Sequence, residues 1–397
     1  MRIILAVFTS VLSFIILFSA CSKEKDSGTL ATYPAIKETF GNNINLDQLE
    51  NYSAQVRPVY IMKDNSGANP ITNAKATLGR VLFYDKNLSI DNSVACASCH
   101  QQSFAFGDPS VASKGVEGGT TARHSMRLIN TRFGNELKFF WNERAASLEQ
   151  QTTQPIQDHA EMGFSGQNGR PDFSTLLLKL QNLNYYQEFF RFVYGDQQVT
   201  EQRLQECLAQ FVRSIQSFDS KYDAGRIMSP NDGAPFPNFS PQENQGKQLF
   251  LQPPNFNGNG IRIAGGAGCA GCHQPPEFDI NPNTRNNGIT STIAGNTKDF
   301  GNTRSPSIRD LTNNTGTVNS PMMHQGGFTT LRSVVLHYNQ IIRDPDNNNL
   351  DPRLTPGGNP QQLQLTENEI TVLVAFLQTL SGNNVYTDKK WSDPFIK

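Results

Sequence analysis

The sequence has little net charge and few cysteines, and each scarcity excludes a class of protein. Its 34 basic and 35 acidic side chains leave a formal net charge of −1 over 397 residues, whereas a nucleic-acid-binding protein normally carries a basic excess. The six cysteines are too unevenly spread to staple a small domain with disulfides. With 31 Gly, 22 Pro and 26 Phe, the composition indicates a loop-rich globular protein of more than one domain.

Long apolar runs are also absent after the first residues, so no later segment reaches the roughly 20 residues of a membrane-spanning helix. The early run, from Ile3 to Phe18, follows a basic start and precedes Cys21, which predicts a signal peptide over residues 1–21. A cysteine after small residues resembles the bacterial lipoprotein box, and an ordinary signal peptide is the alternative. We expect a polar tether over 22–55 and a periplasmic or cell-envelope protein that contacts the membrane only through a lipid on Cys21.

The remaining chain contains an internal duplication. Each copy has a Gly before a Leu-Phe pair, then a Cys-x-x-Cys-His motif, then a Phe and an Asp. The first copy places these at Gly79, Cys96 to His100, and Phe106 with Asp108; the second places them at Gly246, Cys269 to His273, and Phe278 with Asp279. The pattern predicts two related domains at 56–228 and 243–397. Four prolines in the linker at 229–242 exclude a continuous helix there.

The spacing of apolar residues predicts a mainly α fold with long loops. Helices are expected over 176–183, 185–194 and 201–222, because apolar residues recur at helical intervals in each. Thr366 and Glu369 form a capping box that opens another helix. Strand patterns are sparse, and the residues 281–304 are expected to form a loop.

The two Cys-x-x-Cys-His motifs carry the chemistry. Thiols three residues apart can form thioethers with the two vinyl groups of one haem, and the adjacent His can ligate its iron. We therefore expect two covalently attached c-type haems, held by Cys96, Cys99, His100, Cys269, Cys272 and His273. A structural zinc site would need a second Cys/His pair at suitable spacing, and a redox dithiol would not require the His. Cys207 is expected to be a lone buried thiol.

The stretch between the motifs, residues 139–162, resembles the bacterial di-haem cytochrome c peroxidases. Further matching pieces are Leu78 to Phe83 and Pro321-Met-Met-His324, and the similarity covers nearly all of the chain after about residue 56. The resemblance implies two cytochrome c-like haem domains, of which the N-terminal one is peroxidatic and the C-terminal one transfers electrons.

The resemblance also implies the catalytic residues. Gln151 and Glu161 match the pair that lines the peroxide pocket of the N-terminal haem, Pro155 matches the pocket wall, and Trp141 matches the aromatic residue between the haems. Glu161 would move a proton between the peroxide oxygens, and Gln151 would orient the peroxide. The implied reaction reduces hydrogen peroxide to water through a ferryl iron, with electrons from a cytochrome c or a cupredoxin. Without the resemblance, Trp141 would be a core aromatic and Glu161 a solvated carboxylate.

The sequence departs from the better-known peroxidases on the loop after the first haem motif. These enzymes often carry a switchable distal His where this chain has Val116, so the first haem should be open without reductive activation. His124 stands where the family commonly has an Asn that helps to hold calcium. Carbonyl groups near Asn319 and Pro321 remain as a candidate calcium site.

A second departure concerns the C-terminal haem. Tyr338 lies 14 residues after His324, where the peroxidases place an axial Met, and the substitution resembles MauG, whose second haem has a Tyr ligand. His337 is the competitor, but it lies about 100° around the helix from the apolar face that includes Tyr338. We expect Tyr338 to ligate the iron and His324 to hydrogen-bond near a haem propionate.

Three functions follow from these expectations. The first is the peroxidase. The second is a MauG-like enzyme that oxidises a side chain of a protein substrate, and the third is an electron-transfer cytochrome without enzymatic activity. A carrier would close both irons with Met or His, whereas a peroxidase leaves one open. Dimers are common among the family's peroxidases, so the resemblance allows a homodimer.

Overall fold

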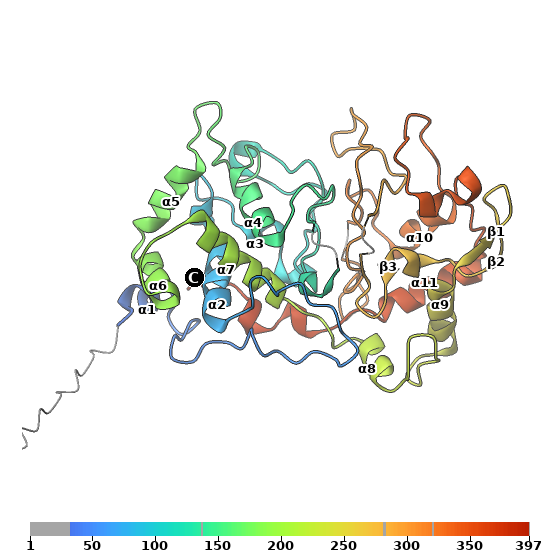
Figure 1. The fold of residues 1–397 in the computed structure, drawn as a ribbon, viewed down its shortest axis with the longest axis horizontal. Coiled ribbons are helices and arrows are strands. Elements are labelled where there is room, and N and C mark those ends of the chain that lie inside the picture. The colour runs from blue at the N-terminus through green and yellow to red at the C-terminus, as the bar shows by residue number, and fades with distance from the viewer. Residues whose placement is uncertain (1–31, 136–137, 281–282, 320, 397) are drawn as a thin grey trace, which may run out of the picture. The chain divides into compact units, whose positions relative to one another are not determined.

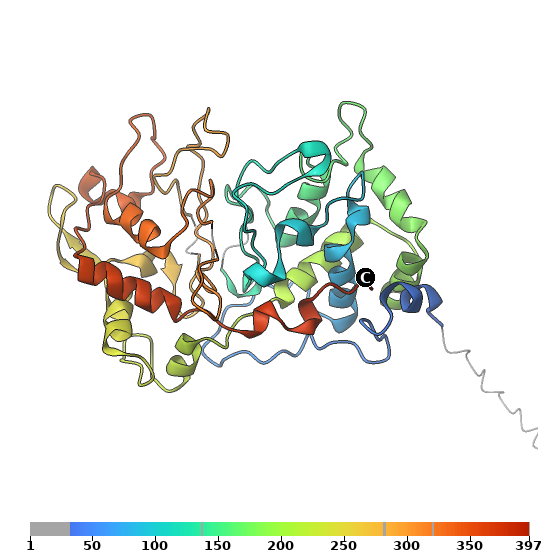
Figure 2. The same ribbon diagram turned by 180° about the vertical axis from the view of Figure 1, so that it is seen from behind.

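We describe the fold from a computed structural model, which places residues 32–135, 138–280, 283–319 and 321–396. The expected signal peptide, Cys21 and the first part of the tether lie outside these residues. From Pro34 onward the chain forms one compact unit (Figures 1 and 2). Within the described ranges, no helix combines the length and apolar character needed to cross a bilayer.

The unit is mainly helical, which confirms the predicted fold class. The first half contains α1 (Pro34–Phe40), α2 (Asn73–Tyr84), α3 (Cys96–Cys99), α4 (Leu148–Gln157), α5 (Phe173–Gln181), α6 (Asn184–Tyr194), α7 (Glu201–Ser214) and α8 (Lys221–Ile227). The second half contains α9 (Pro241–Leu251), α10 (Leu331–Asn339) and α11 (Glu367–Gln378). Two antiparallel pairs, β1 (Pro254–Phe256) with β2 (Arg262–Gly265) and β3 (His273–Gln274) with β4 (Asp279–Ile280), complete the second half. The expected capping box at Thr366 is present at the start of α11.

The duplicated glycines make the same close helix crossing in each half. A Cβ atom on Gly79 of α2 would lie 2.0 Å from the carbonyl oxygen of Cys207 on α7. A Cβ atom on Gly246 of α9 would lie 1.9 Å from the carbonyl oxygen of Val372 on α11. Only a residue without a side chain permits such an approach. Each Cys-x-x-Cys-His motif therefore follows a helix that packs closely against the last long helix of its own half, α2 against α7 and α9 against α11.

The helix predicted over 201–222 is wrong in its second part. α7 ends at Ser214, and Ile215 has an extended backbone with φ −74° and ψ 104°. The Ile215 carbonyl accepts a hydrogen bond from the backbone N–H of Asn130 at 2.9 Å, and the Asn130 side chain accepts from the Ser217 N–H at 2.9 Å. A new helix, α8, then begins at a capping box of Ser220 and Asp223. Tertiary hydrogen bonds thus override the helical pattern.

The segment expected as a tether up to residue 55 is instead packed from residue 34. Ile36 and Phe40 on α1 are buried, and the Phe40 and Phe189 rings meet edge-to-face at 5.6 Å. The Glu188 carboxylate accepts hydrogen bonds from the N–H groups of Ala35 and Ile36 and so caps α1. Polar composition concealed this contact because few apolar residues carry it.

The chain end also crosses between halves, which changes the boundary expected for the second domain. After α11, residues 384–396 return to the first half and pack beside α2 (Figures 1 and 2). Trp391 is 2% exposed there, and its carbonyl accepts a hydrogen bond from the Tyr84 hydroxyl at 2.7 Å. The Arg80 Nε donates to the Ser392 carbonyl at 2.6 Å. The second half alone therefore comprises residues up to about 383.

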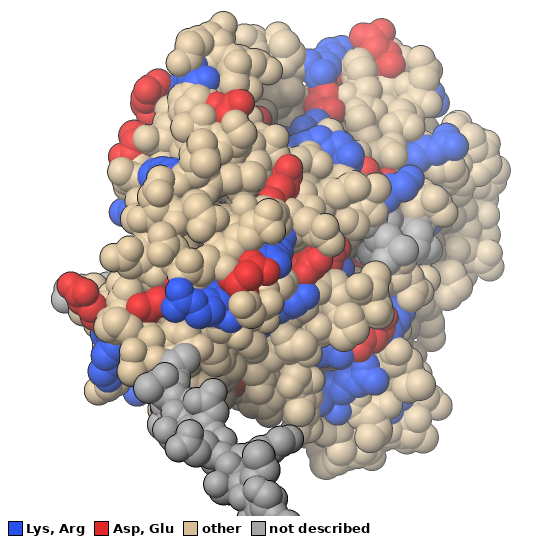
Figure 3. All heavy atoms as spheres, turned by 60° about the vertical axis from the view of Figure 1, so that its left-hand side comes forward, with Lys and Arg blue, Asp and Glu red and all other residues tan. Residues whose placement is uncertain are grey.

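The face of the molecule in Figure 3 carries mixed charge. Basic and acidic side chains lie interspersed among uncharged ones on the face in Figure 3. Mixed charge of this kind gives no long-range steering toward a strongly charged partner.

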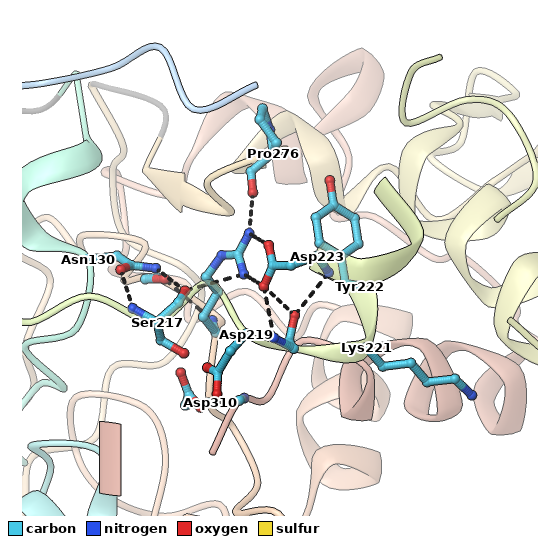
Figure 4. Close-up of polar contacts among 12 residues, drawn as sticks. Asn130, Ser217, Asp219, Lys221, Tyr222, Asp223, Pro276 and Asp310 are labelled. Atoms are coloured by element: carbon cyan, nitrogen blue, oxygen red, sulfur yellow. Dashed lines mark hydrogen bonds and ion pairs between the residues drawn. The ribbon is translucent and has the colours of Figure 1, made fainter. Parts of the chain in front are cut away.

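A buried ion pair joins the segment between the halves to the second haem motif. Asp223 on α8 and the Pro276 carbonyl converge on one guanidinium group (Figure 4), that of Arg309. Both guanidinium Nη atoms donate to Asp223, at 2.8 and 3.0 Å, and one also donates to Pro276 at 2.8 Å. Arg309 is fully buried, so the chain three residues after His273 is held by a desolvated, bidentate contact.

Candidate active site and haem cavity

The first haem motif presents its histidine in a fixed orientation. α3 supplies Cys96 and Cys99, and the His100 N–H donates to the Cys96 carbonyl at 3.0 Å. The His100 Nδ1 lies 3.2 Å from the Phe106 carbonyl, so Nδ1 can donate there and leave Nε2 for a metal. Burial lowers the pKa of His100, which keeps the imidazole neutral, as a ligand requires.

A strained turn positions the carbonyl that holds His100. Ala105 and Phe106 both have left-handed backbones, with φ 53° and 58°, a conformation that residues other than glycine rarely adopt. Both residues are fully buried. Such strain persists only where packing over-determines it, so the orientation of His100 is built into the core of the first half.

Glu161 lies close to the two thiols of this motif. Its negative charge contributes to the raised pKa of both Cys96 and Cys99. Burial and the charge of Asp158 raise the pKa of Glu161 to about 7, against the opposing effect of Arg144. A carboxyl group with such a pKa can exchange protons near neutral pH.

Two other residues expected at the first haem site lie on α4. Gln151 and Pro155 are four residues apart on α4, and therefore on one face of the helix. The Val116 N–H donates to the Glu161 carbonyl at 3.0 Å, and the Val116 side chain is 1% exposed. An apolar side chain thus lies next to the Glu161 backbone. Among the described residues, no hydrogen bond links the side chains of Gln151 and Glu161.

Trp141 is held between the two halves. Its indole Nε1 donates to the His124 carbonyl at 2.7 Å, and its own carbonyl accepts from the Arg304 N–H at 2.7 Å. Its ring meets that of His324 edge-to-face at 6.2 Å. His324 is 2% exposed, and its ring nitrogens have no hydrogen-bond partner within the described structure. The expected indole therefore sits where the halves meet.

The second haem motif opens into a cavity of about 430 Å³. Cys269, Cys272 and His273 line it from one end, and Trp141 lines it from the first half. Many further lining side chains are apolar, among them Phe250, Leu331, Val334, Val335, Leu373 and Leu377. Burial lowers the pKa of His273 to about 4, so this imidazole is also neutral. A large apolar cavity with both thiols and an imidazole at its wall fits a covalently bound haem.

Tyr338 lines this cavity, whereas His337 is turned away from it. The His337 Nε2 lies 3.0 Å from the Asn287 carbonyl, and its ring packs edge-to-face on Phe328 at 5.7 Å. Burial raises the pKa of the Tyr338 phenol, so ionisation of this group needs a nearby cation. The placement agrees with the helical-face argument made from the sequence.

Asn319, one of the two residues expected at a calcium site, makes hydrogen bonds within the protein. The Asn319 carbonyl accepts a hydrogen bond from Arg127 Nη1 at 3.3 Å, so a guanidinium already faces this oxygen. The Asn319 side chain donates to the Asp310 carbonyl and to the Tyr386 hydroxyl, both at 2.8 Å. Within the described ranges, no group of three or more His, Cys, Asp or Glu residues could hold a metal. His124, in place of the expected Asn, uses its Nδ1 on the Ser110 carbonyl at 3.0 Å.

Sequence reasoning missed the charged neighbours of Glu161. The Arg144 guanidinium stacks 3.4 Å above the Phe140 ring and donates to the Asn142 side chain at 3.1 Å. Phe140 has a left-handed backbone with φ 69°, which no spacing pattern indicates. Asp158, three residues earlier in the chain, adds to the effect of burial in raising the Glu161 pKa. His159, whose Nδ1 lies 2.9 Å from the Ser165 hydroxyl, takes no part in either site.

Comparison with known proteins agrees with this geometry. Residues 73–228 match the family model of the di-haem cytochrome c peroxidases. The methylamine utilization protein MauG of Methylophilus methylotrophus is 27% identical over 322 residues, which cover 79% of this chain and 84% of that protein. A cytochrome-c peroxidase of Denitromonas iodatirespirans is 28% identical over 350 residues, which cover 79% and 83% of the two chains.

A solved structure shares the fold. A MauG-like protein associated with microbial copper homeostasis superposes with a TM-score of 0.64 at 26% identity, over 85% of this chain and 98% of that chain. Two haem motifs on two mainly α halves define a di-haem c-type cytochrome. Over most of its length the chain is therefore similar to the bacterial di-haem cytochrome c peroxidases and MauG, and this similarity implies two c-type haems.

Proposed function

We propose that this protein is an exported, lipid-anchored di-haem peroxidase that reduces hydrogen peroxide to water. The observation that carries the proposal is Glu161, a carboxyl group beside both thiols of the first haem motif with a pKa of about 7. A general acid–base works best when its pKa lies near the operating pH. A carboxyl group with a purely structural role does not need such a pKa, and a simple electron carrier does not need such a group beside its haem motif.

A haem attached at Cys96 and Cys99, with His100 as its ligand, would supply the iron on which peroxide is reduced. Glu161 takes the proton from the near oxygen of the peroxide and returns it to the leaving oxygen, while Gln151 orients the peroxide. One peroxide, two electrons and two protons give two water molecules. Val116 supports the proposal because its side chain cannot ligate iron and so leaves the distal position free.

The electrons would enter from a small redox protein through the second haem. His273 and Tyr338 are the proposed ligands there, and both line the cavity. Trp141 lines the same cavity from the first half, and we assign it to the electron-transfer path between the haems. Mixed surface charge fits a weakly steered donor, such as a cytochrome c or a cupredoxin (Figure 3).

A MauG-like oxidation of a protein side chain is the second candidate. It is favoured by Tyr338, because a phenolate ligand would lower the potential of the second haem and help to hold oxidised iron. MauG proteins are also among the relatives, at 27% identity. In this case the two electrons would come from the protein substrate instead of a carrier.

Peroxide titration of the ferric holoprotein, with and without a reduced carrier, tests the proposal. Rapid oxidation of reduced cytochrome c or cupredoxin by peroxide supports the peroxidase. A stable peroxide-oxidised form that no carrier discharges favours the MauG-like function. A ferric spectrum that lacks a high-spin haem and does not change with peroxide would exclude both enzymatic functions. The protein would then be an electron-transfer cytochrome.

A further inference from the structure

Arg304, which is buried, and Arg127, which is half-buried, lie at the junction of the halves. Arg304 is 7% exposed, and neither it nor Arg127 forms an ion pair within the described ranges. The Nε atoms of both are buried without a hydrogen-bond acceptor in the described structure. Burial also lowers the pKa of Arg127, against the opposing effects of Tyr386 and Asp310.

Two other buried arginines are paired with carboxylates. Arg309 pairs with Asp223 through two hydrogen bonds, and Arg213 pairs with Glu149. Leaving a buried charge without a counter-charge is strongly unfavourable. These two guanidinium groups are thus paired with carboxylates, whereas Arg127 and Arg304 form no ion pair among the described residues.

The contacts that the two arginines do make are with neutral groups. Arg127 Nη1 donates to the Asn319 carbonyl at 3.3 Å. Arg304 Nη1 lies 3.9 Å from the Met126 sulfur, and its guanidinium lies 5.2 Å from the Phe139 ring centroid. Among the described residues, these contacts leave the Nε donor of each guanidinium without an acceptor. Both side chains line the cavity that Cys269 and Cys272 also line.

We propose that Arg127 and Arg304 form a clamp for the two propionate carboxylates of the haem held at Cys269 and Cys272. A guanidinium presents its N–H donors as a planar fork that matches a carboxylate. The clamp supplies the missing anions, and it places both carboxylates at the junction of the halves. The inference rests on the proposed function in one respect, namely that a haem fills this cavity.

The clamp has a structural consequence because its members come from different halves. Arg127 belongs to the loop between the first haem motif and Trp141, whereas Arg304 follows the second haem motif. The Arg304 backbone N–H donates to the Trp141 carbonyl at 2.7 Å. Carboxylates held by both arginines would therefore tie the second haem to the backbone on each side of the junction, next to the proposed electron path.

The test uses the full holoprotein with the substitutions Arg127→Gln, Arg127→Lys and Arg304→Gln. Arg262→Gln is the matched control, because Arg262 is a largely buried arginine that pairs with Glu369 outside the cavity. Covalent haem is counted as the pyridine haemochrome. The midpoint potential of each haem is measured by optical redox titration, with cyanide to mark the open haem. Resonance Raman spectra follow the propionate bending bands.

We expect Arg127→Gln and Arg304→Gln to lower the potential of the second haem, since loss of a nearby cation favours ferric iron. The propionate bands of that haem should shift as well. Arg127→Lys should retain most of the potential, and Arg262→Gln should change neither readout. If one glutamine variant fails to fold, the other is sufficient for both measurements.

Unchanged potentials and unchanged propionate bands in a wild-type-like, two-haem protein would overturn the clamp alone. A shift confined to the haem at Cys96 and Cys99 would also overturn it, because the carboxylates would then belong to the other haem. A wild-type protein without haem at Cys269 and Cys272 would instead overturn the proposed function, and the clamp with it.

Discussion

Replacing Glu161 with Gln should slow the reaction of the ferric protein with peroxide while both haems remain attached. The amide has almost the same shape as the carboxyl group but cannot accept the peroxide proton at neutral pH. Proton transfer by a positioned side chain contributes typically about 10²- to 10⁴-fold to a rate, which corresponds to roughly 3–5 kcal/mol of barrier. We expect a loss within this range.

The pH dependence gives the sharper test. Because the Glu161 pKa is raised to about 7, the carboxyl group is protonated and inactive as a base below that pH. The wild-type rate should therefore rise with pH through about 7 and level off above it, and the Glu161→Gln variant should lack this step. Asp158→Asn removes a charge that raises the Glu161 pKa, so the step should move to lower pH. Arg144→Gln removes an opposing charge, so the step should move to higher pH.

Stopped-flow absorbance of the ferric protein, mixed with peroxide on both sides of pH 7, measures these rates. Glu117→Gln is the control, since Glu117 is an exposed carboxylate on the Val116 loop that pairs with Arg170. It should leave the step in place. The reasoning is refuted if Glu161→Gln reacts as fast as wild type, or if Asp158→Asn and Arg144→Gln shift the step in the same direction.

Two further predictions concern packing and ligation. Gly79→Ala and Gly246→Ala should each lower the free energy of unfolding by at least about 1–3 kcal/mol, the usual cost of overpacking, because the new Cβ would meet a backbone carbonyl. Denaturant titration measures the change, with Gly67→Ala at an open site as the control. Equal stability of all three variants would contradict the prediction. Tyr338→Phe should convert the second haem from low to high spin, whereas His337→Gln should not; the electron paramagnetic resonance spectrum of the ferric protein decides, and the reverse outcome would assign the iron to His337.

The attachment residues of both haem sites could be predicted from the sequence, because each set lies in one contiguous motif. The two Cys-x-x-Cys-His motifs specify thioether bonds and a proximal His within five residues each. The glycines at 79 and 246 were visible as repeated positions, although their purpose was not. That purpose depends on a carbonyl contributed from far along the chain, by Cys207 or Val372, which no local pattern contains.

Other features were hidden because long-range contacts override local composition. The polar segment before residue 56 suggested a tether, yet Ile36 and Phe40 are buried against the first half. The apolar stripe past Ser214 suggested a continuous helix, yet hydrogen bonds with Asn130 end it. In each case a few tertiary contacts outweigh a regular pattern, since propensity is a weak preference of tenths of a kcal/mol per residue.

The sequence by itself determined the covalent chemistry, the mainly α class and the duplication, because each rests on residue type at short, fixed spacing. The tertiary structure alone decided the electrostatics of the two sites. Burial beside Asp158 raises the Glu161 pKa toward neutrality, and the Nε atoms of Arg127 and Arg304, which line one cavity, are buried without an acceptor among the described residues. Charge and solvation depend on what surrounds a group in space, and those surroundings come from residues that are distant in the chain.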